Sequence, residues 1–205
     1  MRVLIADAFP ERYLNDLRAL GLEVVYDPNA TTESLPEKVQ RTHILVVRST
    51  KVDRATIAAG KDLGLILRAG AGYDTIDVVT ASERGIYVAN CPGKNAIAVA
   101  ELAFGLMLAI DRRIADGAAD LRRGVWNKKE YSKADGLKGK AIGVIGLGSI
   151  GLAVVERAKA FEMHVLAHSR SLSFARAEEL GVEYCSSLHE IAEKADIITV
   201  HLAQT

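Results

Sequence analysis

The sequence has little cysteine, no excess of charge of either sign and no long apolar run. Its two cysteines, Cys91 and Cys185, are far apart, which argues against a disulfide framework and a zinc cluster. Lysine plus arginine and aspartate plus glutamate both total 26, so composition indicates no nucleic-acid partner. No apolar run approaches the roughly 18 residues of a membrane span, and no signal-peptide pattern precedes the first expected strand. We therefore expect a cytoplasmic protein with no metal site.

Hydrophobic residues make up 49% of the 205 residues, enough for a sizeable core in more than one domain. Through residue 94, short runs rich in β-formers alternate with helical patterns, which predicts parallel strands joined by crossover helices. A helix is expected over 95–115, followed by a polar, glycine-punctuated linker. From residue 140 the alternation restarts. The strands expected there cover 141–146, 163–168, 182–185 and 196–201.

The segment GLGSIG, residues 146–151, follows the apolar run AIGVI and opens an amphipathic helix, and the strand pattern HVLAH comes next. Gly146 permits a tight turn, Gly148 lets the backbone approach a pyrophosphate, and Gly151 allows the helix to pack closely on the strand. The free N–H groups at the start of the helix, at Ser149 and Ile150, suit phosphate oxygens. The segment predicts a dinucleotide site, the alternative being an ordinary strand-to-helix turn.

No acidic residue ends the second strand of this motif, where an NAD site places a carboxylate on the adenosine ribose. Ser169 removes the repulsion that a carboxylate would exert on the extra phosphate of NADP. Arg170 adds a guanidinium that suits a phosphate, with Arg176 as a possible neighbour. The pair predicts a site that tolerates or prefers NADP(H). The alternative is that Arg170 is a solvated surface residue and Ser169 caps the loop.

The second unit supplies four expected strands, whereas a doubly wound dinucleotide fold has about six. The strand IITV is expected beside the glycine-loop strand, with no partner on its other edge. We therefore expect an incomplete dinucleotide-binding domain in a C-terminally truncated protein.

Six segments occur in a characteristic order: RSTKVDRATIAAG, LRAGAGYDTID, NCPGKNAIAVAELAFGLML, RRGVWNKKEY, LKGKAIGVIGLGSIG and ADIITVHLAQT. Together they resemble the D-isomer-specific 2-hydroxyacid dehydrogenases over essentially the whole chain, with the phosphoglycerate dehydrogenases as the nearest branch. The resemblance implies an α/β protein with a flavodoxin-like substrate-binding domain over 1–94, lacking its C-terminal return. It also implies a partial Rossmann-like dinucleotide-binding domain over 95–205, with the hinge helix 95–115.

The resemblance also implies which residues bind the substrate. Arg48 and Arg68 match arginines that contact the substrate phosphate, the alternative being two surface charges. In the loop RAGAGYD, backbone N–H groups around Ala71 and Gly72 match those facing the substrate carboxylate and the nicotinamide. Asn95 matches a residue that organises the cleft, and its position before an apolar run also suits a helix N-cap. The implied substrate-binding residues are Arg48, Arg68, Ala71, Gly72 and Asn95.

On the cofactor side, Leu202 and Ala203 match a segment that passes under the nicotinamide, although the family usually has proline at the second position. The expected cofactor-binding residues are Gly146, Gly148, Ser149, Ile150, Gly151, Ser169, Arg170, Leu202 and Ala203. The family's catalytic arginine, glutamate and histidine match nothing before residue 205, so no catalytic residue is assigned in this chain. His201 ends the last expected strand and is predicted to be structural.

The implied activity is NAD(P)-dependent oxidation of a D-2-hydroxy acid, with 3-phosphoglycerate converted to 3-phosphohydroxypyruvate as the first choice. The chain alone is expected to be inactive, and the resemblance implies a homodimer acting on a small 2-hydroxy or 2-keto acid. Two alternatives remain open: a reductase of hydroxypyruvate or glyoxylate, and a non-catalytic, nucleotide-binding regulatory module.

Overall fold

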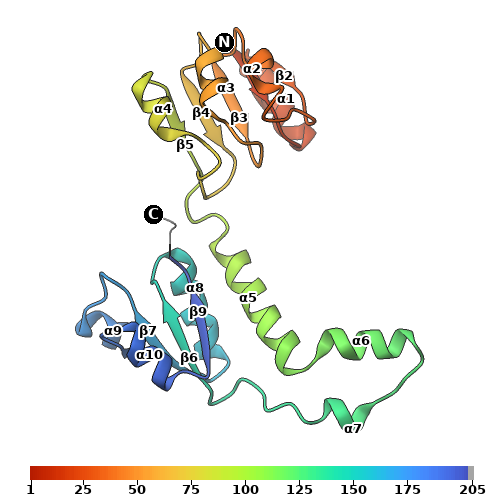
Figure 1. Ribbon diagram of the computed structural model, residues 1–205, viewed down its shortest axis with the longest axis vertical. Coiled ribbons are helices and arrows are strands. Elements are labelled where there is room, and N and C mark those ends of the chain that lie inside the picture. The colour runs from red at the N-terminus through yellow and green to blue at the C-terminus, as the bar shows by residue number, and fades with distance from the viewer. Residues whose placement is uncertain (203–205) are drawn as a thin grey trace. The chain divides into compact units, whose positions relative to one another are not determined.

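A computed structural model describes residues 1–202, and the chain divides into two compact units, Met1–Lys94 and Asn95–Thr205. Each unit is built on one parallel β-sheet with helices on its faces (Figure 1). The predicted fold class, α/β with a flavodoxin-like and a Rossmann-like unit, is confirmed. The longest helix within residues 1–202 has 16 residues, and no helix there is both long and apolar enough to cross a membrane.

The first unit contains a five-stranded sheet of order β2-β1-β3-β4-β5 in which all neighbours are parallel. This is the flavodoxin-like order, in which the strand order reverses between β1 and β3. The strands are β1 (Arg2–Ile5), β2 (Glu23–Tyr26), β3 (Ile44–Val47), β4 (Leu65–Arg68) and β5 (Tyr87–Ala89). The helices are α1 (Glu11–Ala19), α2 (Leu35–Lys38), α3 (Arg54–Ala59) and α4 (Val78–Glu83).

Alternate residues of β1 face opposite helical layers, as the two-residue period of a strand requires. Leu4 is buried in a cluster that includes Ile57 of α3 and side chains of α2 and α4. Ile5 points to the other face, where it packs with Leu14 of α1. Both faces of β1 are therefore buried, which explains its continuous apolar sequence.

The second unit contains a four-stranded parallel sheet of order β8-β7-β6-β9, so the order reverses between β6 and β9. Its strands are β6 (Ala141–Ile145), β7 (His164–His168), β8 (Glu183–Tyr184) and β9 (Ile197–Val200). Its helices are α5 (Ala96–Asp111), α6 (Ile114–Arg122), α7 (Lys128–Tyr131), α8 (Ser149–Ala160), α9 (Phe174–Leu180) and α10 (Leu188–Lys194). The strand IITV, now β9, pairs with the glycine-loop strand β6 as predicted and lies at the sheet edge within the described residues.

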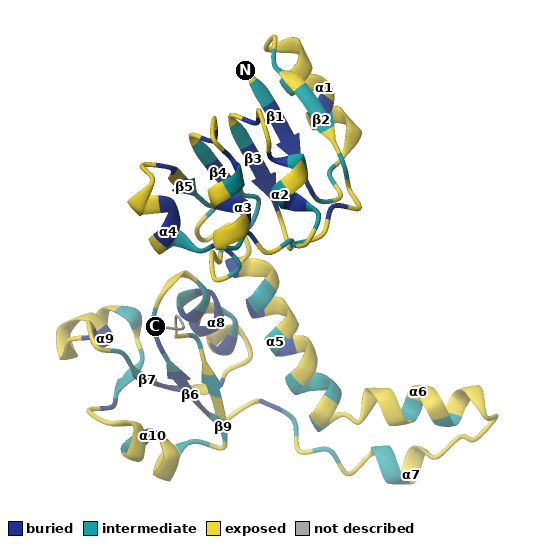
Figure 2. Cartoon of the chain, turned by 45° about the horizontal axis from the view of Figure 1, so that its top comes forward, coloured by how far each residue is buried: buried dark blue, intermediate teal, exposed yellow. Residues whose placement is uncertain are grey.

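Helices α5 and α8 pack on one face of this sheet, against Ile142 and Val144 of β6. On the opposite face Ile191 of α10 packs with Leu166 of β7. A Cβ atom on Gly143 would overlap the side chain of Ile191, so glycine lets α10 lie directly on β6. Figure 2 shows that the buried residues concentrate in the strands and in the helix faces turned toward them.

Within residues 1–202, four helices begin with a side-chain cap, which satisfies one of the free N–H groups of the first turn. In each, an aspartate or serine oxygen accepts a hydrogen bond from the N–H three residues later. The capping residues are Asp53 of α3, Asp77 of α4, Ser173 of α9 and Ser187 of α10.

The helix expected over 95–115 is shorter than predicted, and the polar segment after it is not a simple linker. Helix α5 ends at Asp111 because Arg113 adopts a left-handed backbone conformation with φ +51°, and α6 starts at the next residue. The segment then folds back through α7. The Asp111 carboxylate accepts the N–H of Gly136 at 3.0 Å and pairs with Lys140, which ties the returning chain to the end of α5.

Candidate functional site

The glycine turn after β6 has a backbone that only glycine adopts without strain at its first position. Gly146 has φ +92°, a left-handed value, and its N–H donates to the carbonyl oxygen of His168 at 2.8 Å. A Cβ atom on Gly146 would lie 2.5 Å from the carbonyl oxygen of His201. The turn is therefore closed on one side by the end of β7 and on the other by the end of β9.

Gly151 lies in the first turn of α8 and faces the glycine turn. A Cβ atom there would overlap the carbonyl oxygen of Gly146 and touch Val144 at 3.6 Å. The missing side chain thus allows α8 to start directly against the end of β6.

Gly148 differs from these two glycines because the space around it is open. It has an extended backbone, and a Cβ atom there would meet nothing within 4 Å. Gly148 is the N-cap of α8, and no side chain of residues 1–202 caps this helix. The first-turn N–H groups of Ser149 and Ile150 are therefore available to a ligand, and the helix dipole favours an anionic one.

The glycine turn lies at the topological switch point of the second sheet. The chain runs from β6 through β7 to β8 on one side and returns to β9 on the other. The N–H of His201 donates to the carbonyl oxygen of Ile145 at 2.8 Å, so the ends of β6 and β9 remain adjacent. Open α/β sheets bind ligands outside the carboxyl ends of the strands at this point.

Beside the turn, the β7–α9 loop borders a hollow of about 200 Å³. Its lining residues are Leu147, Leu152, Ser171, Leu172, Arg176 and Leu180. Ser169 is half-buried and its carbonyl oxygen accepts the N–H of Leu172 at 3.1 Å, which forms the turn after β7. Arg170 is exposed, whereas the Arg176 guanidinium pairs with Glu179 at 2.6 Å. Of the two arginines, Arg170 is free of ion pairs within the part of the chain that the structure describes.

At the end of β9, Nε2 of His201 hydrogen-bonds to Oγ1 of Thr199 at 2.9 Å. Burial lowers the pKa of His201 below its ordinary value, which favours the neutral imidazole. Leu202 is exposed, and its side chain approaches Gly146. Ala203 lies outside the described residues.

In the first unit, Arg48 and Arg68 lie at the carboxyl ends of the adjacent strands β3 and β4. Val47 is paired with Arg68, and the N–H of Ala69 donates to the carbonyl oxygen of Val47 at 2.7 Å. Arg48 is exposed. The Arg68 guanidinium folds over Gly70 so closely that a Cβ atom on Gly70 would overlap it. The buried Nε of Arg68 has no hydrogen-bond partner among residues 1–202.

The loop after β4 turns its carbonyl groups toward the end of β5. The carbonyl oxygen of Gly70 accepts the N–H of Cys91 at 2.9 Å, and that of Ala71 accepts Nδ2 of Asn90 at 2.6 Å. The N–H groups of Ala71 and Gly72 have no acceptor within the described chain. Two unpaired backbone donors thus lie in the same loop that Arg68 covers.

Asp7, at the end of β1, is a residue that the sequence analysis missed. Its Oδ2 accepts the backbone N–H groups of Arg48, Ser49 and Thr50 at 2.7, 3.1 and 3.1 Å. Burial raises the pKa of Asp7, but these three hydrogen bonds more than offset burial and hold the pKa below its usual value. The only available signal was an aspartate two residues after a buried parallel strand.

Asn95 precedes α5 in the second unit. It occupies the N-cap position, yet its side chain makes no capping hydrogen bond, so the expected side-chain cap is absent there. Further along α5, Glu101 pairs with Arg157 of α8 at 3.1 Å, which joins the two helices.

Glu183, Cys185 and Glu190 offer three possible ligand atoms within 4.8 Å of one another. Nζ of Lys194 already bridges the two carboxylates, at 2.8 Å from each. Burial raises the pKa of the Cys185 thiol, which disfavours the thiolate that a metal needs. The group is a lysine-bridged ion cluster.

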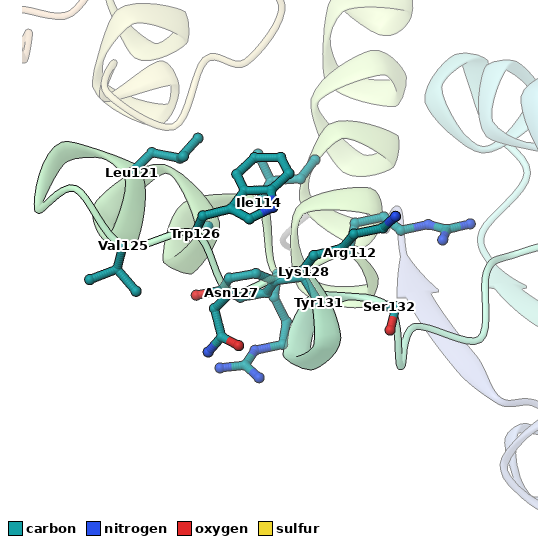
Figure 3. A pocket seen from close by; sticks show the side chains of 11 residues that line it. Arg112, Ile114, Leu121, Val125, Trp126, Asn127, Lys128, Tyr131 and Ser132 are labelled. Atoms are coloured by element: carbon teal, nitrogen blue, oxygen red, sulfur yellow. The ribbon is translucent and has the colours of Figure 1, made fainter.

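Helix α6 and the turn after it carry an exposed apolar cluster, the hairpin cluster, made of Ile114 and Leu121 of α6 and of Val125 and Trp126 of the turn. These four residues are among those that line a hollow of about 310 Å³ (Figure 3). Trp126, the only tryptophan, is 76% exposed. Such a cluster is unusual on a surface that faces only water.

A family model described as "D-isomer specific 2-hydroxyacid dehydrogenase, NAD binding domain" matches residues 104–205. D-3-phosphoglycerate dehydrogenase of Methanocaldococcus jannaschii is 43% identical, over 100% of this chain and 39% of that protein. Glyoxylate reductase of Thermococcus litoralis is 37% identical, over 100% of this chain and 64% of that protein.

Among solved structures, NAD⁺-bound 3-phosphoglycerate dehydrogenase of Entamoeba histolytica superposes with a TM-score of 0.79 at 28% identity, over 100% of this chain and 63% of that one. The chain spans about two fifths of the length of its phosphoglycerate dehydrogenase relatives. The chain belongs to the D-isomer specific 2-hydroxyacid dehydrogenase family, and its residues 104–205 match that family's NAD-binding domain.

Proposed function

We propose that the protein is an NAD(P)-dependent oxidoreductase of D-2-hydroxy acids, with 3-phosphoglycerate as the substrate. The observation that carries this proposal is the uncapped start of α8 behind a turn in which Gly146, Gly148 and Gly151 each meet a different requirement of a dinucleotide site. In this proposal residues 95–205 hold the cofactor and residues 1–94 hold the substrate.

When bound, the nicotinamide supplies the hydride chemistry. The residues of this chain bind and orient the cofactor and the substrate. Ser149 and Ile150 hold the pyrophosphate through their N–H groups, and Leu202 limits the space beside Gly146. The N–H groups of Ala71 and Gly72 hold the substrate carboxylate. No proton transfer is assigned to His201, because its Nε2 is bonded to Thr199 and its pKa is lowered by burial.

The choice of 3-phosphoglycerate rests on Arg48 and Arg68, two guanidinium groups on neighbouring strand ends, where a phosphate accepts charge-assisted hydrogen bonds. The unpaired buried Nε of Arg68 supports a ligand on that side chain, since such donors are normally satisfied. Glyoxylate or hydroxypyruvate is the second candidate, favoured by the likeness to a glyoxylate reductase. These acids carry no phosphate.

We expect Arg68→Ala to weaken binding of 3-phosphoglycerate by about 10- to 100-fold, because a hydrogen bond to a charged group is worth about 1.5–3 kcal/mol. Isothermal titration of the whole chain measures this, with glyoxylate as the phosphate-free comparison. Lys61→Ala, an exposed cation before the opposite end of β4, is the matched control and leaves the affinity unchanged. Equal losses for both acids in Arg68→Ala would favour the second candidate.

We further propose that the cofactor site accepts the extra phosphate of NADP(H) through Ser169 and Arg170. Titration followed by nicotinamide fluorescence is expected to show NADPH binding at least as tightly as NADH. Arg170→Ala is expected to weaken NADPH about 5- to 10-fold and leave NADH unchanged, as expected for one lost guanidinium–phosphate contact on an exposed surface. Arg54→Ala, at an exposed arginine of α3 in the first unit, is the control. Tighter binding of NADH would rule out the preference.

We also propose that the protein forms a homodimer through α5–α7, which is supported by the exposed hairpin cluster. Sedimentation equilibrium is expected to give the mass of two chains for the native protein and of one chain for Trp126→Asp. Tyr87→Asp, an equally exposed aromatic residue in the first unit, is expected to remain dimeric. A monomeric native protein would contradict this proposal.

A further inference from the structure

Three consecutive backbone N–H groups converge on one oxygen atom in the first unit. Oδ2 of Asp7 lies 2.7 Å from the nitrogen of Arg48 and 3.1 Å from those of Ser49 and Thr50. Successive N–H groups pointing into one concavity form an anion-binding nest. Here the anion belongs to the chain itself.

This nest lies at the topological switch point of the first sheet. Asp7 follows β1 and Arg48 follows β3, the two neighbouring strands between which the order β2-β1-β3-β4-β5 reverses. Flavodoxin-like sheets of this order bind ligands at the β1/β3 switch point. In this protein the Asp7 carboxylate fills the nest there, so an incoming anion does not find these N–H groups free.

The same hydrogen bonds fix the backbone from which Arg48 projects. Oγ1 of Thr50 adds a hydrogen bond to the carbonyl oxygen of Ala6 at 3.1 Å, so residues 48–50 are attached to the end of β1 by four bonds. The exposed Arg48 side chain then starts from an ordered backbone beside the end of β4, where Arg68 lies.

We propose that Asp7 is a positioning residue whose carboxylate permanently occupies the nest, orders residues 48–50 and thereby directs Arg48 toward the anionic group of the substrate. The inference rests on the proposed function, because it takes Arg48 as a substrate contact. It also explains why recognition at the end of β3 falls to the Arg48 side chain: the backbone N–H groups of residues 48–50 are already bonded to Asp7. The lowered pKa of Asp7 agrees with a carboxylate that stays ionised at neutral pH.

The test compares the native chain with Asp7→Ala and with Asp7→Asn, which keeps an acceptor oxygen but no charge. Amide hydrogen exchange of residues 48–50 is measured by NMR, with sodium formate added as a free carboxylate and sodium chloride at equal ionic strength as its control. Asp27→Ala is the matched variant, since Asp27 follows the neighbouring strand β2 and pairs with Lys38.

In Asp7→Ala we expect exchange at residues 48–50 to become at least tenfold faster, formate to restore much of the protection, and chloride to have no effect. Affinity for 3-phosphoglycerate is expected to fall at least fivefold and to recover partly with formate. Asp7→Asn should fold, with intermediate protection and affinity. The native chain and Asp27→Ala should not respond to formate at residues 48–50.

Unchanged protection of residues 48–50 in both Asp7 variants would overturn the inference, as would an equal response of the native chain to formate. Loss of affinity in Arg48→Ala but native affinity in Asp7→Ala would overturn it as well. If Arg48→Ala binds 3-phosphoglycerate as the native chain does, the proposed substrate role of Arg48 fails. The rescue of exchange by formate still reports separately on whether Asp7 orders the loop.

Discussion

Gly151→Ala is expected to destabilise the second unit by about 3 kcal/mol and to abolish cofactor binding. The added Cβ atom would overlap the carbonyl oxygen of Gly146, a backbone atom that cannot rotate away. Relief requires a shift of α8 relative to β6, and overpacking of this kind typically costs about 1–3 kcal/mol. We place this variant at the upper end of that range because the Cβ atom is fixed by the helix backbone and the atom that it meets is a backbone oxygen.

Amide hydrogen exchange of β6 is the appropriate measurement, because a chain of two units need not unfold in one step. About 3 kcal/mol corresponds to roughly 100-fold faster exchange when exchange requires unfolding of the unit. Exchange in β1 of the first unit serves as the internal control and should not change. Native protection of β6 in this variant would mean that α8 does not pack against the turn as described.

Gly148→Ala, unlike Gly151→Ala, is expected to leave the second unit folded. NADH binding is expected to be weakened about 10- to 100-fold. A Cβ atom at this position meets nothing within 4 Å, and the extended backbone suits alanine. The cost in stability is that of a poorer N-cap, below about 1 kcal/mol. The side chain would occupy the space that a pyrophosphate needs, and it would displace hydrogen bonds to charged oxygens worth about 1.5–3 kcal/mol.

Fluorescence titration with NADH and exchange in β6 are measured on the same sample of Gly148→Ala. Weak NADH binding together with native protection of β6 would mean that Gly148 contacts the ligand. If NADH affinity and the protection of β6 fall together, Gly148 is needed for the fold, and the open space around it is not a cofactor site.

Sequence patterning predicted parallel strands joined by helices in both units, because apolar runs separated by helical patterns are local signals. The strand order of a doubly wound dinucleotide fold predicted the pairing of β9 with β6, which the structure confirms. The end of the helix expected over 95–115 was wrong by four residues. The backbone is left-handed at Arg113, where the sequence has neither the glycine nor the asparagine that usually adopts this conformation. Nothing in the sequence therefore marked the end of α5.

The candidate site residues also differ in whether local sequence reveals them. Gly146, Gly148 and Gly151 have a fixed spacing, and each meets a local requirement of the backbone that can be recognised in the sequence. Asp7 cannot be recognised in this way, because its three hydrogen bonds join residues more than 40 positions apart and form only once β1 and β3 are adjacent. The missing side-chain cap at Asn95 likewise depends on a rotamer that residue type does not determine.

The most direct test of the proposed dinucleotide site is an NMR titration of the chain with NADH. We expect saturable amide shifts concentrated at residues 146–151, with smaller shifts at residues 168–170 and 201–202, where the strand ends meet. Shifts confined to another part of the chain, such as the hollow between α6 and α7, or no saturable shift at residues 146–151, would contradict the claim that the glycine turn holds the dinucleotide.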